Sequence, residues 1–169
     1  MTPIDTSSPT PPSSNKIPIA GLLDALNGHP TEDALARFTT SRDWEVLAPY
    51  LRLEDLRRGH ILTARGALDR TLYFLESGLL RVHYGSDTSG FVVATVGPGS
   101  VLGEGAFFSE LERNATVQAA MPCRVWTLTP ESFKKLRQAH TDVALSLAMA
   151  LGATVSMRML DVTKRAVVT

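Results

Sequence analysis

The sequence lacks the features of disulfide-linked proteins, multi-cysteine metal proteins, general polyanion binders and membrane proteins. Its 169 residues include one cysteine, Cys123, which excludes an internal disulfide and any multi-cysteine metal site. Lys plus Arg and Asp plus Glu number 17 each, and this balance argues against a general polyanion binder. The uncharged apolar stretch 143–157 is shorter than the ~18 residues of a membrane span, and the N-terminus has no signal pattern. We therefore expect a cytoplasmic protein that does not associate with a membrane.

The pattern of residue types divides the chain into four parts. Residues 1–16 are rich in Ser, Thr and Pro without apolar periodicity, which predicts a disordered tail. Residues 17–52 have apolar side chains at helical spacing, whereas 53–128 alternate with period two between glycine turns. Residues 129–169 begin with Thr-Pro-Glu, which predicts the start of one helix, and a second, long helix is predicted over roughly 141–165. This order predicts a mainly β fold, a roll or sandwich, with flanking helices.

One run within the β region, 103–116, joins a glycine-rich turn, an acidic residue, a short amphipathic stretch and an arginine. Backbone N–H groups at the start of a short helix suit an anion, because they are unpaired and the helix dipole is positive there. The guanidinium of Arg113 can clamp the same anion through two hydrogen bonds. Glu104 can accept hydrogen bonds from sugar hydroxyls. A ligand with a phosphate and a ribose hydroxyl would satisfy all these features.

This run resembles the phosphate-binding cassette of cyclic nucleotide-binding domains, a family that includes the bacterial cyclic AMP receptor regulators and the regulatory subunits of protein kinase A. Glu104 and Arg113 are nine positions apart, the spacing of the kinase-type cassette. The resemblance implies a double-stranded β-helix (jelly-roll β-roll) with N-terminal helices, an inserted cassette helix and a long C-terminal helix. It extends over about 53–160, where further family motifs occur in order at 58–66, 72–78 and 97–104.

The resemblance also implies roles for individual residues. Glu104 would hold the ribose 2′-hydroxyl and Arg113 the cyclic phosphate, which the amides of the cassette helix would also face. Asn114 occupies a position that tunes purine choice in the family. Arg158 stands where the long helix of the bacterial regulators supplies polar residues to the purine. The predicted ligand-binding residues are Gly103, Glu104, Gly105, Ala106, Arg113, Asn114, Ala115 and Arg158.

Several residues depart from the family pattern, and they leave alternatives open. Gly105 replaces a bulky apolar residue, Glu112 replaces a proline, and Arg158 with Met159 replaces Thr-Ser. The two cassette charges, Glu104 and Arg113, can instead form an ordinary ion pair with each other or with other surface charges. For Arg158 the alternative to a purine contact is a solvated or internally paired side chain.

The long C-terminal helix predicts a homodimer. Ala148, Gly152 and Ser156 recur every four residues, and small side chains on one face let two helices approach closely. The alternative is that this face packs on the chain's own roll. No helix-turn-helix follows before Thr169, so we expect no direct DNA binding.

Nothing in the sequence predicts an enzyme. The four histidines show no His-x-His spacing, and His83 is expected to point outward beside Arg81, so we expect no catalytic residues, no metal and no cofactor. The sequence predicts a non-enzymatic sensor of cAMP or cGMP that signals through a partner protein. The alternative is an interaction module that keeps the roll but binds no cyclic mononucleotide, or binds another anionic ligand such as a cyclic dinucleotide.

Overall fold

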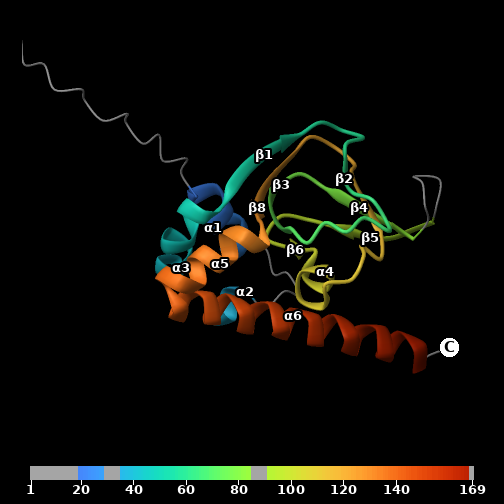
Figure 1. The fold of residues 1–169 in the computed structure, drawn as a ribbon. Coiled ribbons are helices and arrows are strands. Elements are labelled where there is room, and N and C mark those ends of the chain that lie inside the picture. The colour runs from blue at the N-terminus through green and yellow to red at the C-terminus, as the bar shows by residue number, and fades with distance from the viewer. Residues whose placement is uncertain (1–18, 29–34, 85–90, 168–169) are drawn as a thin grey trace, which may run out of the picture.

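Two antiparallel sheets and the helices around them form the structure, a computed structural model that describes residues 19–28, 35–84 and 91–167 (Figure 1). For 91–93 and 161–167 the description is limited to the backbone. The predicted tail, 1–16, lies outside the described residues. The two sheets with flanking helices confirm the predicted fold class.

The described residues of the period-two region form eight strands in two four-stranded sheets. The strand orders are β1-β8-β3-β6 and β2-β7-β4-β5, with antiparallel pairing throughout. Neighbours in a sheet are mostly distant in sequence, which is the crossover pattern of a roll. The strands are β1 Arg52–Leu56, β2 Ile61–Thr63, β3 Leu72–Ser77, β4 Leu80–Tyr84, β5 Phe91–Val96, β6 Val101–Leu102, β7 Thr116–Ala119 and β8 Cys123–Leu128.

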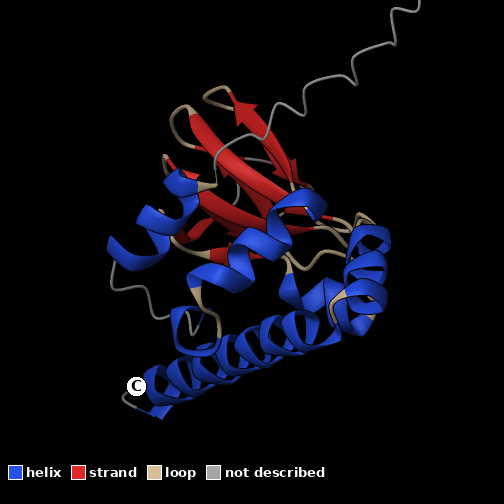
Figure 2. Cartoon of the chain, turned by 90° about the vertical axis from the view of Figure 1, so that its left-hand side faces the viewer, coloured by secondary structure: helices blue, strands red, loops and turns tan. Residues whose placement is uncertain are grey.

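The helices lie at one end of the roll and along one side of it (Figures 1 and 2). The N-terminal helices and α5 gather at the end, α6 runs along the side, and the short α4 lies between α6 and the strands. The helices are α1 Ala20–Gly28, α2 Leu35–Phe38, α3 Ser41–Leu47, the 3₁₀ turn η1 Ala48–Tyr50, α4 Glu104–Ser109, α5 Pro130–Ala139 and α6 Thr141–Val167.

Two helix starts are fixed by threonine caps. The predicted cap Thr129 accepts a hydrogen bond from the Ser132 amide at 3.1 Å, and Pro130 follows it at the first helical position. Thr40 and Asp43 form a reciprocal capping box at the start of α3, which the sequence analysis did not predict. The N-cap predicted at Thr31 lies outside the described residues.

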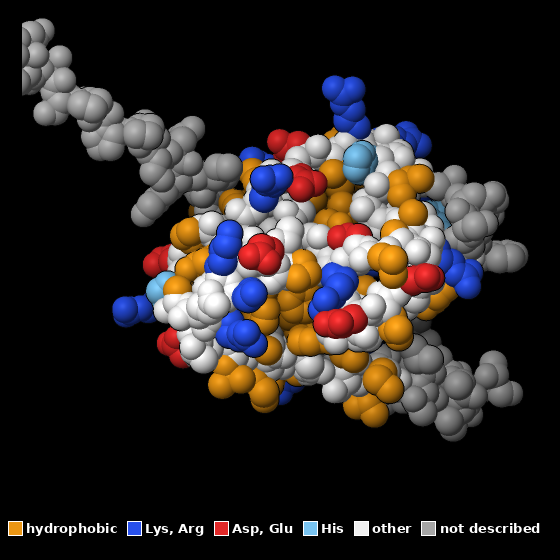
Figure 3. Space-filling view, in the orientation of Figure 1, with side chains coloured by type: hydrophobic (Ala, Val, Ile, Leu, Met, Phe, Trp, Pro, Cys, Tyr) orange, Lys and Arg blue, Asp and Glu red, His pale blue; other side chains and the backbone are white. Residues whose placement is uncertain are grey.

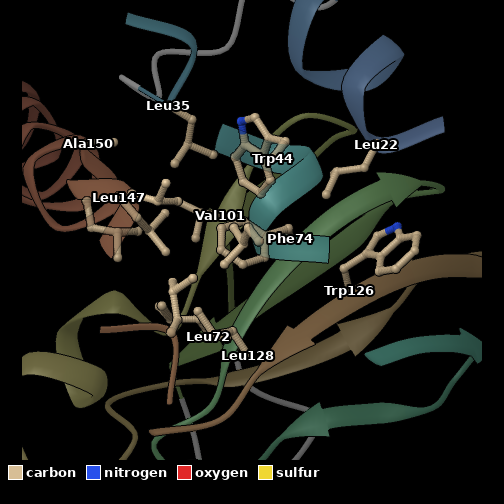
Figure 4. Packing of buried hydrophobic residues seen from close by; sticks show 14 of the residues in the cluster. Leu22, Leu35, Trp44, Leu72, Phe74, Val101, Trp126, Leu128, Leu147 and Ala150 are labelled. Atoms are coloured by element: carbon tan, nitrogen blue, oxygen red, sulfur yellow. The ribbon is translucent and has the colours of Figure 1, made fainter. Parts of the chain in front are cut away.

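The main hydrophobic core joins the helices to the roll (Figure 4). Trp44 of α3 meets Phe74 of β3 edge to face, with ring centroids 5.2 Å apart, and Leu147 brings α6 into the same cluster. A second cluster, which includes Leu75 and Val125, fills the roll itself. Because α6 contributes fully buried side chains to the main core, its first half is fixed to the domain.

Helix α6 changes one expectation about the membrane. The helical stretch Thr141–Leu160 has 20 residues with mean hydropathy 1.6, so by length and composition alone it is long enough to span a bilayer. The apolar stretch 143–157 alone is too short to span a bilayer, but the helix that contains it is not. One third of the apolar window in that stretch is buried inside the domain.

One side chain of β4 does not lie as predicted. His83 is only 3% exposed, although it was expected to point into solvent beside Arg81. It pairs with Thr116 on one side and Val92 on the other, so neighbouring strands flank it on both sides. A strand in the middle of a sheet can bury a polar residue that period-two alternation assigns to the surface.

Candidate functional site

A cavity of about 710 Å³ lies between the roll, α4 and the second half of α6. Its volume falls within the roughly 300–1,000 Å³ of small-molecule sites. The structure places all eight predicted ligand-binding residues along this one cavity, including Arg158, which is 54 positions beyond Glu104. Those residues are Gly103, Glu104, Gly105, Ala106, Arg113, Asn114, Ala115 and Arg158. Their contact with a ligand stays a prediction.

The turn into α4 requires glycine at position 103. Gly103 has φ +88°, a left-handed conformation that side chains disfavour. A Cβ there would lie 2.5 Å from Nη1 of Arg113 and 2.6 Å from the Thr71 carbonyl oxygen. The absence of a side chain therefore lets the arginine reach the backbone at the start of α4. The first-turn N–H groups of α4 have no intrahelical acceptor, so this end of the helix is positive.

Arg113 is buried in the cavity wall, with 5% of its surface exposed. Its Nη1 donates to the Gly103 carbonyl at 3.2 Å, and its Nη2 donates to the Thr71 carbonyl at 2.6 Å and to the Asp69 carboxylate. Its guanidinium carbon lies 5.5 Å from the centroid of the Tyr73 ring. The Nε group is buried and has no hydrogen-bond partner among the described residues.

Asp69 is the partner of Arg113 that the sequence analysis missed. Burial raises the pKa of Asp69, but hydrogen bonds from Arg113, Thr71 and Tyr73 outweigh it and lower the pKa from 3.8 to about 2. The carboxylate is therefore ionised and compensates the buried guanidinium. Burial and the bond to Asp69 raise the pKa of Tyr73 to about 12, so its hydroxyl stays a donor. The available signal was an Asp-x-Thr turn just before a strand, which is common in loops.

Arg70, next in the chain, holds the other end of α4. Its Nη2 donates to the Phe107 carbonyl at 3.1 Å and lies 3.0 Å from Oε1 of Glu110. Glu110 ends the helix in the left-handed conformation, with φ 61°. A cation at a helix C-terminus interacts favourably with the dipole. Two consecutive residues, Asp69 and Arg70, therefore fix both Arg113 and the helix before it.

Glu104 and Arg113 do not pair with each other; each pairs with another charge, which is the second form of the alternative to ligand binding. Glu104 instead accepts a hydrogen bond from Nη1 of Arg158 at 2.6 Å. Nη2 of Arg158 donates to the Val101 carbonyl at 2.7 Å, so the guanidinium joins α6 to β6 and to the start of α4. The side chains of Glu104 and Arg158 are 14% and 34% exposed. Arg158 is thus internally paired while it also lines the cavity.

The described residues contain no group of three or more His, Cys, Asp or Glu side chains that could hold a metal. Cys123 is buried, and its thiol donates to the carbonyls of Met121 at 3.2 Å and Leu79 at 3.4 Å. Burial raises the pKa of Cys123, which keeps it protonated and unreactive.

Known proteins resemble this chain in sequence and in fold. The profile of the cyclic nucleotide-binding domain matches residues 53–140, more than half of the chain. Glutaminase 2 of Bradyrhizobium diazoefficiens is 32% identical over 120 residues, which cover 69% of this chain and 19% of that protein. The chain therefore spans about a fifth of that relative's length.

Solved structures share the fold. A cyclic nucleotide-binding domain from Methylobacillus flagellatus superimposes with a TM-score of 0.74 at 18% identity, covering 87% of this chain and 81% of that one. The regulatory domain of Toxoplasma gondii PKA, crystallised with cAMP, gives a TM-score of 0.58 at 25% identity, covering 72% of this chain and 46% of that one. With the profile match, these findings establish that the chain belongs to the cyclic nucleotide-binding domain family.

Proposed function

We propose that this chain is a non-enzymatic sensor that binds cAMP or cGMP in the cavity beside α4 and signals through a partner protein. The observation that carries the proposal is the state of Arg113. Three of its five N–H groups donate to the protein, while buried Nε has no partner among the described residues. A buried donor without an acceptor costs about 1–3 kcal/mol, so the wall of this cavity favours an anionic acceptor.

The cyclic phosphate is the ligand group that this wall would accept. It would take hydrogen bonds from Arg113 and from the first-turn amides of Gly105 and Ala106 at the positive end of α4. Asp69 does not prevent this, because it accepts from one N–H of the guanidinium, while the buried Nε has no acceptor among the described residues. The phosphate would therefore complete an arrangement that the protein holds in place.

The remainder of the cavity suits a nucleoside. Glu104 would accept a hydrogen bond from the ribose 2′-hydroxyl. Side chains of β4 and β5 also line the cavity, and Val82, Tyr84 and Val96 among them offer apolar and aromatic surface to a purine. Asn114 and Arg158 supply polar groups that could distinguish adenine from guanine.

A homodimer through α6 is part of the proposal. Among the exposed residues described along this helix, five follow the alternating four- and three-residue spacing of a coiled-coil seam: Leu145, Met149, Gly152, Ser156 and Met159. Leu145 is 61% exposed, Met149 53% and Met159 66%, and hydrophobic side chains gather along this edge in Figure 3. On the predicted small-residue face, Gly152 and Ser156 are exposed and Ala148 is half-buried, which supports a face open to a partner helix. A second copy would cover the seam.

A cyclic dinucleotide is the second candidate ligand. A neighbouring hollow of about 660 Å³ shares Arg113 and Asn114 with the cavity and adds Arg65 to its lining. A ligand with two phosphates could reach both arginines. The predictions of no direct DNA binding, no membrane association and a cytoplasmic location accompany either ligand.

Competition binding tests the proposal and separates the candidates. The probe is a fluorescent cyclic nucleotide, displaced by unlabelled cAMP, cGMP or cyclic di-GMP. Displacement at micromolar or lower concentration of one mononucleotide, unchanged by Arg65→Ala, supports the sensor. Displacement by cyclic di-GMP alone, weakened by Arg65→Ala, supports the second candidate. Failure of all three to bind a folded chain would contradict both.

A further inference from the structure

The hollow beside the ligand cavity is lined by four ionisable side chains, two of each sign: Arg65, Glu110, Glu112 and Arg113. Two of them are compensated by charges from outside this lining. Arg113 pairs with Asp69, and Oε1 of Glu110 lies 3.0 Å from Nη2 of Arg70. The other two, one arginine and one glutamate, form no ion pair with any described residue. The hollow therefore offers one unpaired positive charge and one unpaired negative charge.

The backbone holds these two unpaired side chains, Arg65 and Glu112, at the same place. Two hydrogen bonds of 2.8 Å join the loop to the cassette, from the Gly66 amide to the Arg113 carbonyl and from the Arg113 amide to the Ala67 carbonyl. A Cβ on Gly66 would lie 3.8 Å from Oε2 of Glu112, so the carboxylate lies beside the residue that follows Arg65. Because both side chains line one hollow, an anion that approaches Arg65 also approaches Glu112.

The opposite signs decide what a second phosphate would gain in the hollow. Arg65 attracts it and Glu112 repels it, so little net attraction compensates the water that the phosphate must lose. The first phosphate is better served, because in the cavity it would face Arg113, whose buried Nε has no acceptor among the described residues. Repulsive groups of this kind are one of the two ways in which a site gains specificity.

We propose that Glu112 is a specificity-determining residue that makes the site select cyclic mononucleotides and reject cyclic dinucleotides. The inference rests on the proposed function and decides between its two candidate classes of ligand. A mononucleotide has one phosphate and has no need of the hollow. A dinucleotide would extend its second phosphate into the hollow, where the carboxylate offsets the attraction of Arg65.

The readout is a ratio of two affinities, measured by calorimetric titration of the full chain. The ratio compares a cyclic dinucleotide with the mononucleotide of the same base, cyclic di-GMP with cGMP and cyclic di-AMP with cAMP. Glu112→Gln removes the charge, keeps the shape of the side chain and should raise the ratio about threefold or more. Glu112 also lines the cavity, so the substitution can strengthen the binding of both ligands. The dinucleotide gains more, since it carries two phosphate charges and the mononucleotide carries one.

Three further variants and a change of salt separate charge from shape. Glu112→Asp keeps the charge and should leave the ratio near that of the wild type. Glu45→Gln removes an exposed carboxylate of α3 that lines neither space, and should not change the ratio. Adding Arg65→Ala to Glu112→Gln should lower the ratio again, because it removes the charge that attracts the second phosphate. The gain in Glu112→Gln should shrink at about 1 M salt, where the Debye length is roughly 3 Å.

The outcomes distinguish this inference from the proposed function. An unchanged ratio in Glu112→Gln, with mononucleotide binding intact, would overturn the inference and leave the proposed sensor standing. A wild-type chain that binds the dinucleotide more tightly than the mononucleotide would overturn it in favour of the second candidate. A folded chain that binds neither class in any variant would overturn the proposed function together with the inference that rests on it.

Discussion

Replacing Arg113 by alanine should weaken the fold as well as the ligand site. The substitution removes two bonds to carbonyls and the ion pair with Asp69, whose side chain is 39% exposed. Breaking a fully buried pair costs about 3–5 kcal/mol. Because solvent can screen Asp69, we expect the lower end, about 3 kcal/mol in the free energy of unfolding. For a domain of this size that corresponds to a drop of roughly 6–12 °C in Tm.

Chemical denaturation measures this cost, and Arg124→Ala is the matched control. Arg124 also forms ion pairs, with Asp55 and Glu76, but its side chain is 46% exposed and does not line the cavity. Its loss should cost about 1 kcal/mol or less. Equal costs for the two variants would refute the argument that Arg113 is held as a buried, prearranged group. A variant that unfolds at room temperature would still agree with it.

Three further predictions concern the same elements. The wild-type chain should be more stable than Asp69→Asn by a free energy that is constant above about pH 5 and is lost as the pH falls from 3.8 towards 2, because folding lowers the pKa of Asp69. After solvent screening this difference amounts to roughly 1 kcal/mol, and denaturation at each pH measures it. Gly103→Ala should destabilise the domain by about 2 kcal/mol or more, since φ at this position is +88° and the new Cβ would lie 2.6 Å from a backbone oxygen. Gly105→Ala is the control: a Cβ there would meet nothing within 4 Å, so its effect on stability should stay within ~0.5 kcal/mol. Equal effects of the two substitutions would contradict the turn geometry. Met149→Glu should convert a dimer into a folded monomer in sedimentation experiments, and a wild-type chain that is monomeric at all concentrations would remove the α6 seam.

The fold could be predicted because its signals are local and repeated. Period-two alternation, glycine turns and the Thr129-Pro130 helix start each depend on a few neighbouring residues, and all indicate the same architecture. The cassette could be located for a related reason, since its glycine turn and its two charged residues lie within 103–113.

The contacts of the site could not be predicted, because they join distant segments. The sequence places Glu104 and Arg113 close together, yet their partners are Arg158 and Asp69, which lie 54 and 44 positions away. Which arginine pairs with which carboxylate depends on the path of α6 and of the loop before β3. The burial of His83 could not be predicted either, because period-two alternation only tells which side chains share a face of the strand and not whether that face is exposed.

Titration calorimetry of the folded chain with cAMP, cGMP and cyclic di-GMP tests the central claim most directly, with Arg113→Lys and Arg124→Ala in parallel. Lysine keeps the charge but cannot reproduce the guanidinium fork, so binding should weaken by roughly tenfold or more. The Arg124 variant should bind as the wild type does. Micromolar or tighter binding that depends on Arg113 is the predicted result. Binding that is equal in all three proteins, or no binding to a folded wild-type chain, would contradict the account.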